Sequence, residues 1–239
     1  MKKNVWIKLD SHPELHVGQY IVPNFVSNSI ALRLNENEFM VISPGAPLLA
    51  SWPNDLIGPQ IKLHLVMPNA FHYMGIKSWQ QAFPNHCLYA SQAAIPSLIK
   101  KGVANSEADI LALEKSTIEL PPHYSFIFPP GHRAGDVWLK KVNADKTCLW
   151  VTCDSFLNYE RSSNQTMARF LQKILDAAPG LKISQVVKWF ILDDRKTFKH
   201  WALNQLKEDQ PSTLIPGHGE VSQHKELTLQ LEKLILNRL

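Results

Sequence analysis

The chain has 239 residues, of which 45% are hydrophobic, so it is long enough to bury a substantial core in one large domain. Lys and Arg number 25 against 21 Asp and Glu, and this net charge of +4 is spread thinly, which argues against a nucleic-acid partner. The three cysteines, Cys87, Cys148 and Cys153, show no CxxC spacing, so neither a disulfide framework nor a structural zinc knuckle is expected.

The N-terminal stretch MKKNVWIKLDSHPEL begins like a signal peptide, but Lys8, Asp10 and His12 interrupt any apolar run. No segment approaches the ~20 apolar residues that cross a bilayer. We therefore expect a cytoplasmic protein with no membrane partner. A small-molecule substrate or ligand is expected, but the sequence identifies neither this molecule nor the oligomeric state.

Period-two alternation of apolar residues predicts strands over much of the chain. Residues 29–34 and 38–43 flank the polar turn NEN and are expected to pair as a hairpin. Further strands are predicted, in chain order, at residues 61–67, 86–90, 124–128, 136–142, 148–153 and 213–216.

Helical spacing of apolar residues predicts four helices. Residues 70–83 have Asn69 as the expected N-cap, and residues 193–206 form an amphipathic helix whose charges face solvent. The helix at 164–178 begins at an Asn164 cap and stops at Pro179-Gly180, and its apolar residues are expected to face the core: Met167, Phe170, Leu171, Ile174 and Leu175. The last helix, at 222–239, has a similar core-facing set: Leu227, Leu231, Leu234 and Ile235. This order of elements predicts a single α/β domain over residues 1–239, with sheets inside and helices outside.

Four short stretches place a histidine or an aspartate just past an apolar strand, beside small or turn-forming residues. They are PNAFHYMG with His72, FPPGHRAGD with His132, LWVTCDSF with Asp154 and TLIPGHGE with His218. Loops at strand ends can direct side chains into a shared site, and glycine lets the backbone approach closely. Imidazole nitrogen and carboxylate oxygen are common ligands of zinc and of non-haem iron.

The order of these stretches resembles the metallo-β-lactamase superfamily, from MVISPG at Met40 to PGHGE at Glu220. That family carries a His-x-His-x-Asp-His loop before a helix, a later Gly-His, a strand-end aspartate and a final Pro-Gly-His-Gly. The resemblance implies a four-layer αββα sandwich over residues 1–239. It assigns metal-ligand positions to the four residues His72, His132, Asp154 and His218.

Three ligand positions of the family are lost in this chain. Met67 and Asn69 stand where the family has histidines, and Phe71 stands where it has an aspartate. The pattern is therefore more similar to a degenerate branch of the superfamily, of unknown function, with an incomplete metal-binding motif.

The four retained residues limit the number and the kind of metal ions that the site is expected to hold. Three neutral imidazoles and one carboxylate would balance one divalent ion that carries a hydroxide, whereas two ions would leave the site overcharged. We expect at most one ion, zinc or else iron or manganese, bound by His72, Asp154 and His218. His132 is expected as a fourth ligand or as an outer hydrogen-bond donor.

Three functional hypotheses follow. The first is a mononuclear metal-binding protein with hydrolase-like chemistry, although the loss of the aspartate at position 71 argues against the family's two-metal route. The second is a non-catalytic binding or scaffolding member of the fold that holds no metal. The third is an iron-dependent redox protein, on the basis of ligand type alone. The sequence identifies no catalytic residue beyond the metal ligands.

The candidate residues also have purely structural interpretations. His72 could be a packed ring in the first turn of a helix, and Met67 and Phe71 are expected to be core residues. His132 and His218 could be turn residues, and the aspartate after LWVTC could be a cap.

Overall fold

The computed structural model describes residues 4–22, 25–53, 58 and 60–239. The chain divides into two compact units, Met1–Pro121 and Pro122–Leu239. The single domain predicted over residues 1–239 stays a prediction. No helix in the described ranges is both long enough and apolar enough to cross a membrane.

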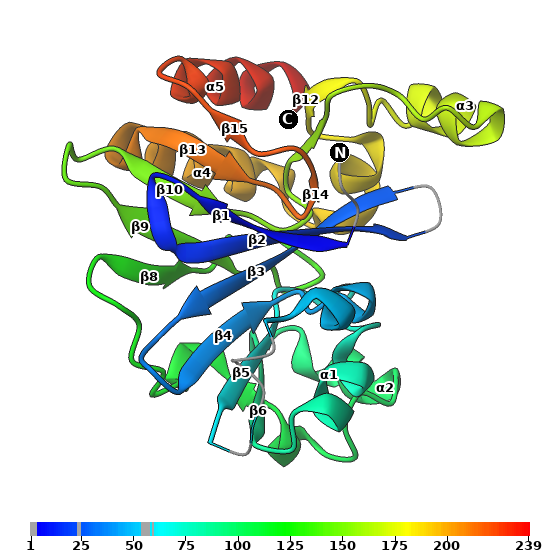
Figure 1. Ribbon diagram of the computed structural model, residues 1–239. Coiled ribbons are helices and arrows are strands. Elements are labelled where there is room, and N and C mark those ends of the chain that lie inside the picture. Colours follow the sequence, from blue (N-terminus) through cyan, green and yellow to red (C-terminus); the bar gives the residue numbers. More distant parts are fainter. Residues whose placement is uncertain (1–3, 23–24, 54–57, 59) are drawn as a thin grey trace. The chain divides into compact units, whose positions relative to one another are not determined.

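The first unit contains a mixed sheet whose strands are neighbours in chain order (Figure 1). They are β1 (Val5–Leu9), β2 (His12–Val22), β3 (Phe25–Arg33), β4 (Glu38–Ile42), β5 (Lys62–Met67), β6 (His86–Ala90) and β7 (Leu111–Ala112). Pairs from β1 to β4 are antiparallel and pairs from β4 to β7 are parallel. The predicted hairpin is confirmed as β3 and β4, with Ile30 opposite Ile42, and the strands predicted at 61–67 and 86–90 are confirmed as β5 and β6.

β5 is a buried strand between two parallel neighbours. Leu63, Leu65, Val66 and Met67 are all buried, which is the pattern of a strand covered on both faces. Because β4 and β5 run parallel, their carboxyl ends meet at the same edge of the sheet. The segments that follow these two strands are therefore neighbours.

Among the described residues of the first unit, the helices are η1 (Ala46–Ser51), α1 (Ile76–Ala82), α2 (Ile95–Lys100), η3 (Glu107–Asp109) and η4 (Leu113–Lys115). An aromatic cluster around Trp52 packs the end of η1 against α1. The Trp52 ring packs edge-on against Trp79 and Trp6, with centroids 5.1 Å and 5.3 Å away. Trp79 is fully buried and its indole N–H donates to the Gly45 carbonyl at 3.0 Å. These contacts fix α1 against the turn that follows β4.

The second unit contains a five-stranded sheet in the order β15-β13-β10-β9-β8 (Figure 1). Its strands are β8 (Tyr124–Ile127), β9 (Trp138–Val142), β10 (Cys148–Val151), β13 (Pro211–Ile215) and β15 (Ser222–Gln223). β10 and β13 are parallel, so their carboxyl ends also share an edge. Beside this sheet, β11 (Leu157–Tyr159) pairs antiparallel with β12 (Gly180–Lys182) and parallel with β14 (His218–Gly219).

Two long helices, α4 (Arg195–Asp209) and α5 (Leu227–Arg238), pack on the core of this unit. The buried core residues include Trp138, Trp150, Phe156, Phe198, Leu206, Leu214, Leu227, Leu231 and Ile235. The core-facing pattern predicted for the last helix is therefore confirmed. Asp194 caps α4 by accepting from the Thr197 N–H at 3.0 Å and from the Thr197 hydroxyl at 2.7 Å. These two hydrogen bonds lower the pKa of the Asp194 carboxyl.

The helix predicted at 164–178 differs from its prediction in bounds and in orientation. It is α3 (Thr166–Ile174), and it has Gln165 rather than Asn164 as its N-cap. Its buried residues are Ala168 and Gln172. Four of the five side chains expected in the core are exposed instead, by 72% at Met167, 58% at Phe170, 48% at Leu171 and 57% at Ile174, whereas Leu175 is half-buried.

The reversed orientation of α3 has a local cause. The side-chain oxygen of Gln172 accepts from the Ser163 N–H at 2.7 Å. The backbone carbonyl of Gln172 accepts from the Ala177 N–H at 2.8 Å and so closes the end of the helix. The Gln172 side chain thereby ties its side of the helix to the loop that precedes α3. The large apolar side chains lie on a different side and face outward.

Candidate functional site

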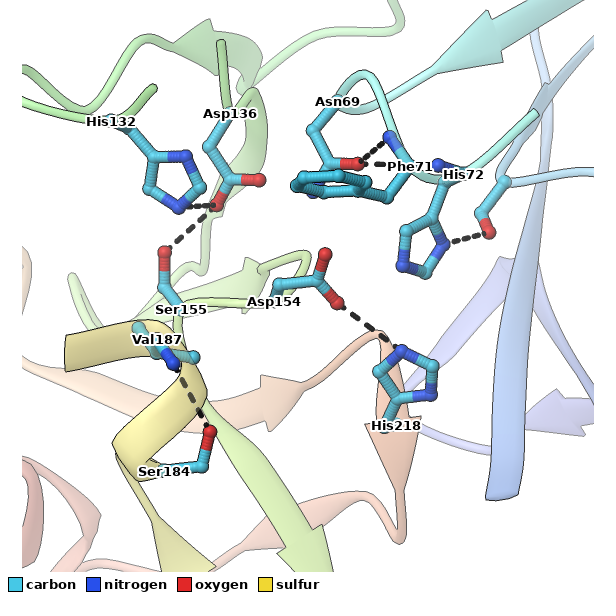
Figure 2. A network of polar contacts seen from close by, with 11 residues as sticks. Asn69, Phe71, His72, His132, Asp136, Asp154, Ser155, Ser184, Val187 and His218 are labelled. Carbon is cyan, nitrogen blue, oxygen red and sulfur yellow. Dashed lines mark hydrogen bonds and ion pairs between the residues drawn. The ribbon is translucent and has the colours of Figure 1, made fainter. Parts of the chain in front are cut away.

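His72 lies in the turn between β5 and α1, before the helix begins. The helix predicted over 70–83 starts later, at Ile76. Asn69 accepts from the Phe71 N–H at 2.8 Å and from the His72 N–H at 3.2 Å, so it caps this turn rather than the helix (Figure 2). Gly75 precedes α1, and a Cβ at this position would lie 2.0 Å from the Pro44 carbonyl oxygen. The turn is thus pressed against the segment that follows β4.

The His72 ring is oriented by a serine of that segment. Nδ1 of His72 lies 2.6 Å from Oγ of Ser43. Ser29 supports Ser43, because its hydroxyl donates to the Ser43 carbonyl at 2.5 Å and accepts from the Gly45 N–H at 2.9 Å. Ser43 is buried and has a positive φ of 54°, so the backbone is held in a left-handed conformation that places this hydroxyl.

The three positions that depart from the family motif have structural roles. Met67 is fully buried at the end of β5, which confirms its prediction as a core residue. Asn69 is buried and caps the turn. Phe71 was expected in the core, and this is wrong: it is 48% exposed, and the Lys101 ammonium lies 4.6 Å from the centre of its ring. The cation–π contact and the turn geometry hold Phe71 at the surface.

In the second unit, Asp154 and His218 face one another across 3.2 Å, measured from Oδ1 to Nε2 (Figure 2). Asp154 follows β10 and His218 follows β13, and these strands are parallel neighbours. The sequence stretches LWVTCDSF and TLIPGHGE therefore meet as expected from their position at strand ends. Asp154 is buried and His218 is half-buried.

The glycines on either side of His218 allow this approach. A Cβ at Gly217 would lie 2.9 Å from the Cys153 carbonyl oxygen, which accepts from the Gly217 N–H at 3.0 Å. Gly219 has a φ of +96°, and a Cβ there would lie 2.0 Å from the Asn158 carbonyl oxygen. The Pro-Gly-His-Gly stretch thus packs backbone against backbone with the loop that carries Asp154.

His132 lies with a different carboxylate. Its Nε2 is 3.4 Å from Oδ2 of Asp136, and both side chains are fully buried. Asp136 also accepts from the Ser155 hydroxyl at 2.8 Å (Figure 2). The Trp138 indole N–H donates to the same carboxylate at 3.1 Å. The donor atoms of His132, Asp154 and His218 do not form a set that lies within 4.8 Å of one another. His132 is thus linked to the Asp154 loop through Asp136 and Ser155, and its role as a fourth ligand stays a prediction.

Buried polar atoms without a hydrogen-bond partner gather around this loop. Among the described residues they include Nδ1 of His132, Oγ1 of Thr152 and the hydroxyl of Tyr159. Burial raises the pKa of Tyr159, and the Asp154 carboxylate raises it further. Burial is the main cause that raises the pKa of the Cys153 thiol well above its usual value, and the charges of Asp154 and Asp136 raise it further. Cys153 is therefore a protonated, buried thiol.

Three polar residues of these networks were not identified from the sequence. Asp136 stands four residues after His132 in the stretch FPPGHRAGD, and that spacing within a glycine turn was an available signal. Ser43 stands directly after a strand that runs parallel to β5, so strand-end reasoning could have found it. For Ser155 we find no signal other than its position next to Asp154.

Comparison with known proteins identifies the fold. No known family profile and no curated protein sequence matches the chain. Solved structures do match: DIM-1 metallo-β-lactamase exposed to ceftazidime has 14% identity and a TM-score of 0.58, with 99% of both chains covered. A metallo-β-lactamase from Pontibacter korlensis has 14% identity and a TM-score of 0.61, covering 97% of this chain and 98% of that one.

Flavoproteins are among the matches as well. A putative diflavin flavoprotein fragment from Nostoc sp. PCC 7120 has 12% identity and a TM-score of 0.63, with 98% of both chains covered. Rubredoxin:oxygen oxidoreductase from Desulfovibrio gigas has 11% identity and a TM-score of 0.63, covering 97% of this chain but 61% of that one. The α/β fold class predicted from the sequence is thereby confirmed, and the chain has the metallo-β-lactamase fold.

Proposed function

We propose that this protein binds one divalent metal ion through His72, Asp154 and His218, and that it supports hydrolase-like chemistry. Asp154 and His218 would supply a carboxylate oxygen and an imidazole nitrogen from the second unit. His72 would supply the third ligand from the first unit. The matches to metallo-β-lactamase structures support this combination, because they span both units of the chain.

The observation that carries the proposal is the spacing of the Asp154–His218 pair. Zinc binds oxygen and nitrogen ligands at ~2.0–2.2 Å, so two ligands of one tetrahedral ion lie roughly 3.4 Å apart. The donor atoms of Asp154 and His218 are 3.2 Å apart. This pair therefore fits one ion with little rearrangement, and the unpartnered hydroxyl of Tyr159 indicates a polar surrounding that the chain's own hydrogen bonds leave incomplete.

The contact between Ser43 and His72 supports binding through a defined ring nitrogen. Metal-bound histidines commonly donate their second ring N–H to an oxygen, which fixes the tautomer and the ring orientation. Because Nδ1 of His72 is engaged by Ser43, coordination would use Nε2.

The charge of the proposed set agrees with one ion rather than two. Its single carboxylate offsets only half the charge of a divalent cation, and a second cation would add charge that no ligand balances. When bound in a favourable site, a zinc ion lowers the pKa of a coordinated water to ~7 and so supplies a nucleophile at neutral pH. The chain's own residues would orient the ion: Ser43 holds His72, and the glycines around His218 hold this histidine against the Asp154 loop.

Metal content of the full chain, purified without an affinity tag, tests the proposal. After incubation with zinc, iron or manganese and removal of free metal, we expect one ion per chain by elemental mass spectrometry. Asp154→Ala, His218→Ala and His72→Ala should each abolish stoichiometric binding. His200→Ala is the matched control, because His200 is exposed on α4 and has no place in the proposed set.

Two results would contradict the proposal. One is metal content well below one ion per chain for the unaltered protein, and the other is binding that Asp154→Ala leaves unchanged. Loss of binding in Asp154→Ala and His218→Ala but not in His72→Ala would confine the site to the second unit. Hydrolysis is then tested with the loaded protein on model esters, lactams and phosphodiesters, with Asp154→Ala as the inactive reference.

A second candidate function is a binding or scaffolding module that holds no metal. The observation in its favour is that Met67, Asn69 and Phe71 occupy family ligand positions as a core residue, a turn cap and a surface residue. A thermal midpoint unchanged by a chelator and by added zinc, iron or manganese would favour this module over the metal protein. Iron-dependent redox chemistry is the third alternative, and a colourless, iron-free protein after expression in iron-rich medium would dismiss it.

A further inference from the structure

Helix α3 exposes an apolar face that the second unit does not cover. At 100° per residue, Met167, Phe170, Leu171 and Ile174 lie within one stripe of the helix, and each is at least 48% exposed. The residues that are buried, Ala168 and Gln172, lie on a neighbouring side. Figure 1 shows α3 at the periphery of its unit, away from α4 and α5. The apolar stripe therefore faces outward although it has the composition of a core face.

The charges that α3 itself carries are all of one sign. Arg169 and Lys173 are exposed, and α3 contains no acidic residue, whereas Arg161, which precedes the helix, lies 3.6 Å from the Glu160 carboxylate. The acid that follows, Asp176, is ion-paired with Lys182 at 3.2 Å and with Arg238. The surface formed by α3 is thus an apolar stripe bordered by two exposed cations, Arg169 and Lys173.

Such a surface is complementary to an anionic lipid bilayer. Amphipathic helices with large apolar residues on one face and Lys or Arg beside it lie in the membrane interface, with the apolar face in the acyl region and the cations at the headgroups. A second copy of the chain is a less suitable partner for the stripe, since the cations of the second α3 would repel those of the first. The four exposed side chains would also bury only roughly half of the ~800 Å² per partner that a stable protein interface uses.

We propose that the apolar stripe of α3, consisting of Met167, Phe170, Leu171 and Ile174, docks on the surface of membranes that contain anionic lipid. Arg169 and Lys173 attract the headgroups, and the stripe inserts its side chains among the lipid chains. The contact is peripheral, in keeping with the short length of α3. It differs from the sequence-based expectation of no membrane partner, which considered only segments that span a bilayer. It does not depend on the metal site proposed above.

Co-sedimentation of the full chain with vesicles tests this inference. One set of vesicles is pure phosphatidylcholine, and the other contains phosphatidylserine as well. We expect binding to the second set that weakens as salt is added. Phe170→Gln should reduce the partition coefficient by about tenfold or more, and Lys173→Gln by roughly fivefold.

The matched control is Leu229→Gln, because Leu229 is 49% exposed on α5. It should bind like the unaltered protein. Failure of the unaltered chain to sediment with phosphatidylserine vesicles at low salt would overturn the proposal, as would equal losses for Phe170→Gln and Leu229→Gln. A dimer in light scattering that Phe170→Gln dissociates, without vesicle binding, would assign the stripe to self-association instead. Because Phe170 is exposed, its substitution should leave the thermal midpoint unchanged.

Discussion

Ser43 and His72, which are 29 residues apart in the chain, meet because β4 and β5 are parallel: Oγ of Ser43 lies 2.6 Å from Nδ1 of His72. The Ser43 N–H also donates to the Val66 carbonyl at 2.9 Å, so the serine is bonded to the strand that leads to His72. The hydroxyl fixes the rotation of the imidazole, and the backbone bond fixes the hydroxyl.

Replacing Ser43 by alanine should therefore weaken metal binding without removing a ligand. Loss of such an outer partner typically costs 10- to 100-fold in metal affinity, and loss of the hydrogen bond about 1 kcal/mol in stability. Competition with a chromophoric chelator measures the first quantity, and urea unfolding measures the second. Ser51→Ala removes a similar serine bond, to the Leu48 carbonyl at 3.1 Å, and should leave metal affinity unchanged. Equal affinities for the two variants would mean that Ser43 does not orient His72 for binding.

Gly219 should be intolerant of any side chain. Its φ of +96° and the 2.0 Å approach of a Cβ to the Asn158 carbonyl oxygen add a backbone clash to conformational strain. We expect Gly219→Ala to destabilise the second unit by at least about 3 kcal/mol and to reduce metal binding by displacing His218. Gly180→Ala separates the two effects, because Gly180 has a φ of +83° and a Cβ there would meet no atom within 4 Å. Gly180→Ala should lower the free energy of unfolding by only about 1 kcal/mol. A similar loss for Gly219→Ala and Gly180→Ala would show that the clash with Asn158 does not contribute.

Much of the fold could be predicted from the sequence because apolar patterns report burial. The sequence predicts strands at β3 to β6, β10 and β13, because their residues alternate between apolar and polar or are continuously apolar. β2 was missed because polar residues interrupt its pattern, and β11, β12 and β14 because each has three residues or fewer. For α3 the helix was found but its orientation was wrong. An amphipathic pattern shows that two faces differ, and only tertiary contacts decide which face is covered.

The candidate site was predictable to the same extent. Asp154 and His218 were found because glycine and turn residues mark strand ends, and parallel strands bring such ends together. The pairing of His132 with Asp136 was missed although their four-residue spacing was a signal, since the contact itself depends on how the turn after β8 folds back. Phe71 was misplaced for a similar reason: its environment is set by Lys101, thirty positions away in the chain.

The stability of the first unit should depend on the titration of His64. Its ring is buried between Glu38 and Tyr89, with Nε2 and Nδ1 each 3.1 Å from their oxygens. Burial lowers the His64 pKa below its usual 6.5, and the Glu38 carboxylate opposes this only in part. The unfolded chain therefore binds a proton more readily, so stability is full above pH ~6.5 and is lost as the pH falls from there through the folded-state pKa.

Thermal midpoints measured from pH about 8 to about 5 check this dependence. His64→Gln should flatten the decline, leaving a smaller slope from His16, whose pKa is also lowered by burial. His200→Gln, at an exposed position on α4, should retain the full decline. If His64→Gln keeps the same slope as the unaltered protein, His64 is not the group that titrates.

Asp209 should be costly to remove from the second unit. It is buried at the end of α4 and accepts from Lys140 at 3.0 Å, from the Trp150 indole N–H at 2.9 Å and from Gln205 at 2.8 Å. Asp209→Ala leaves a largely buried ammonium and a fully buried indole N–H without an acceptor, which should cost about 3–5 kcal/mol in urea unfolding. Asp209→Asn keeps one acceptor oxygen and should cost less.

The exposed Arg133–Asp193 pair, 2.7 Å apart, is the reference for the Asp209 prediction, since Asp193→Ala should cost under about 1 kcal/mol. Comparable losses for the two alanine variants would show that burial does not govern the strength of the Asp209 contacts.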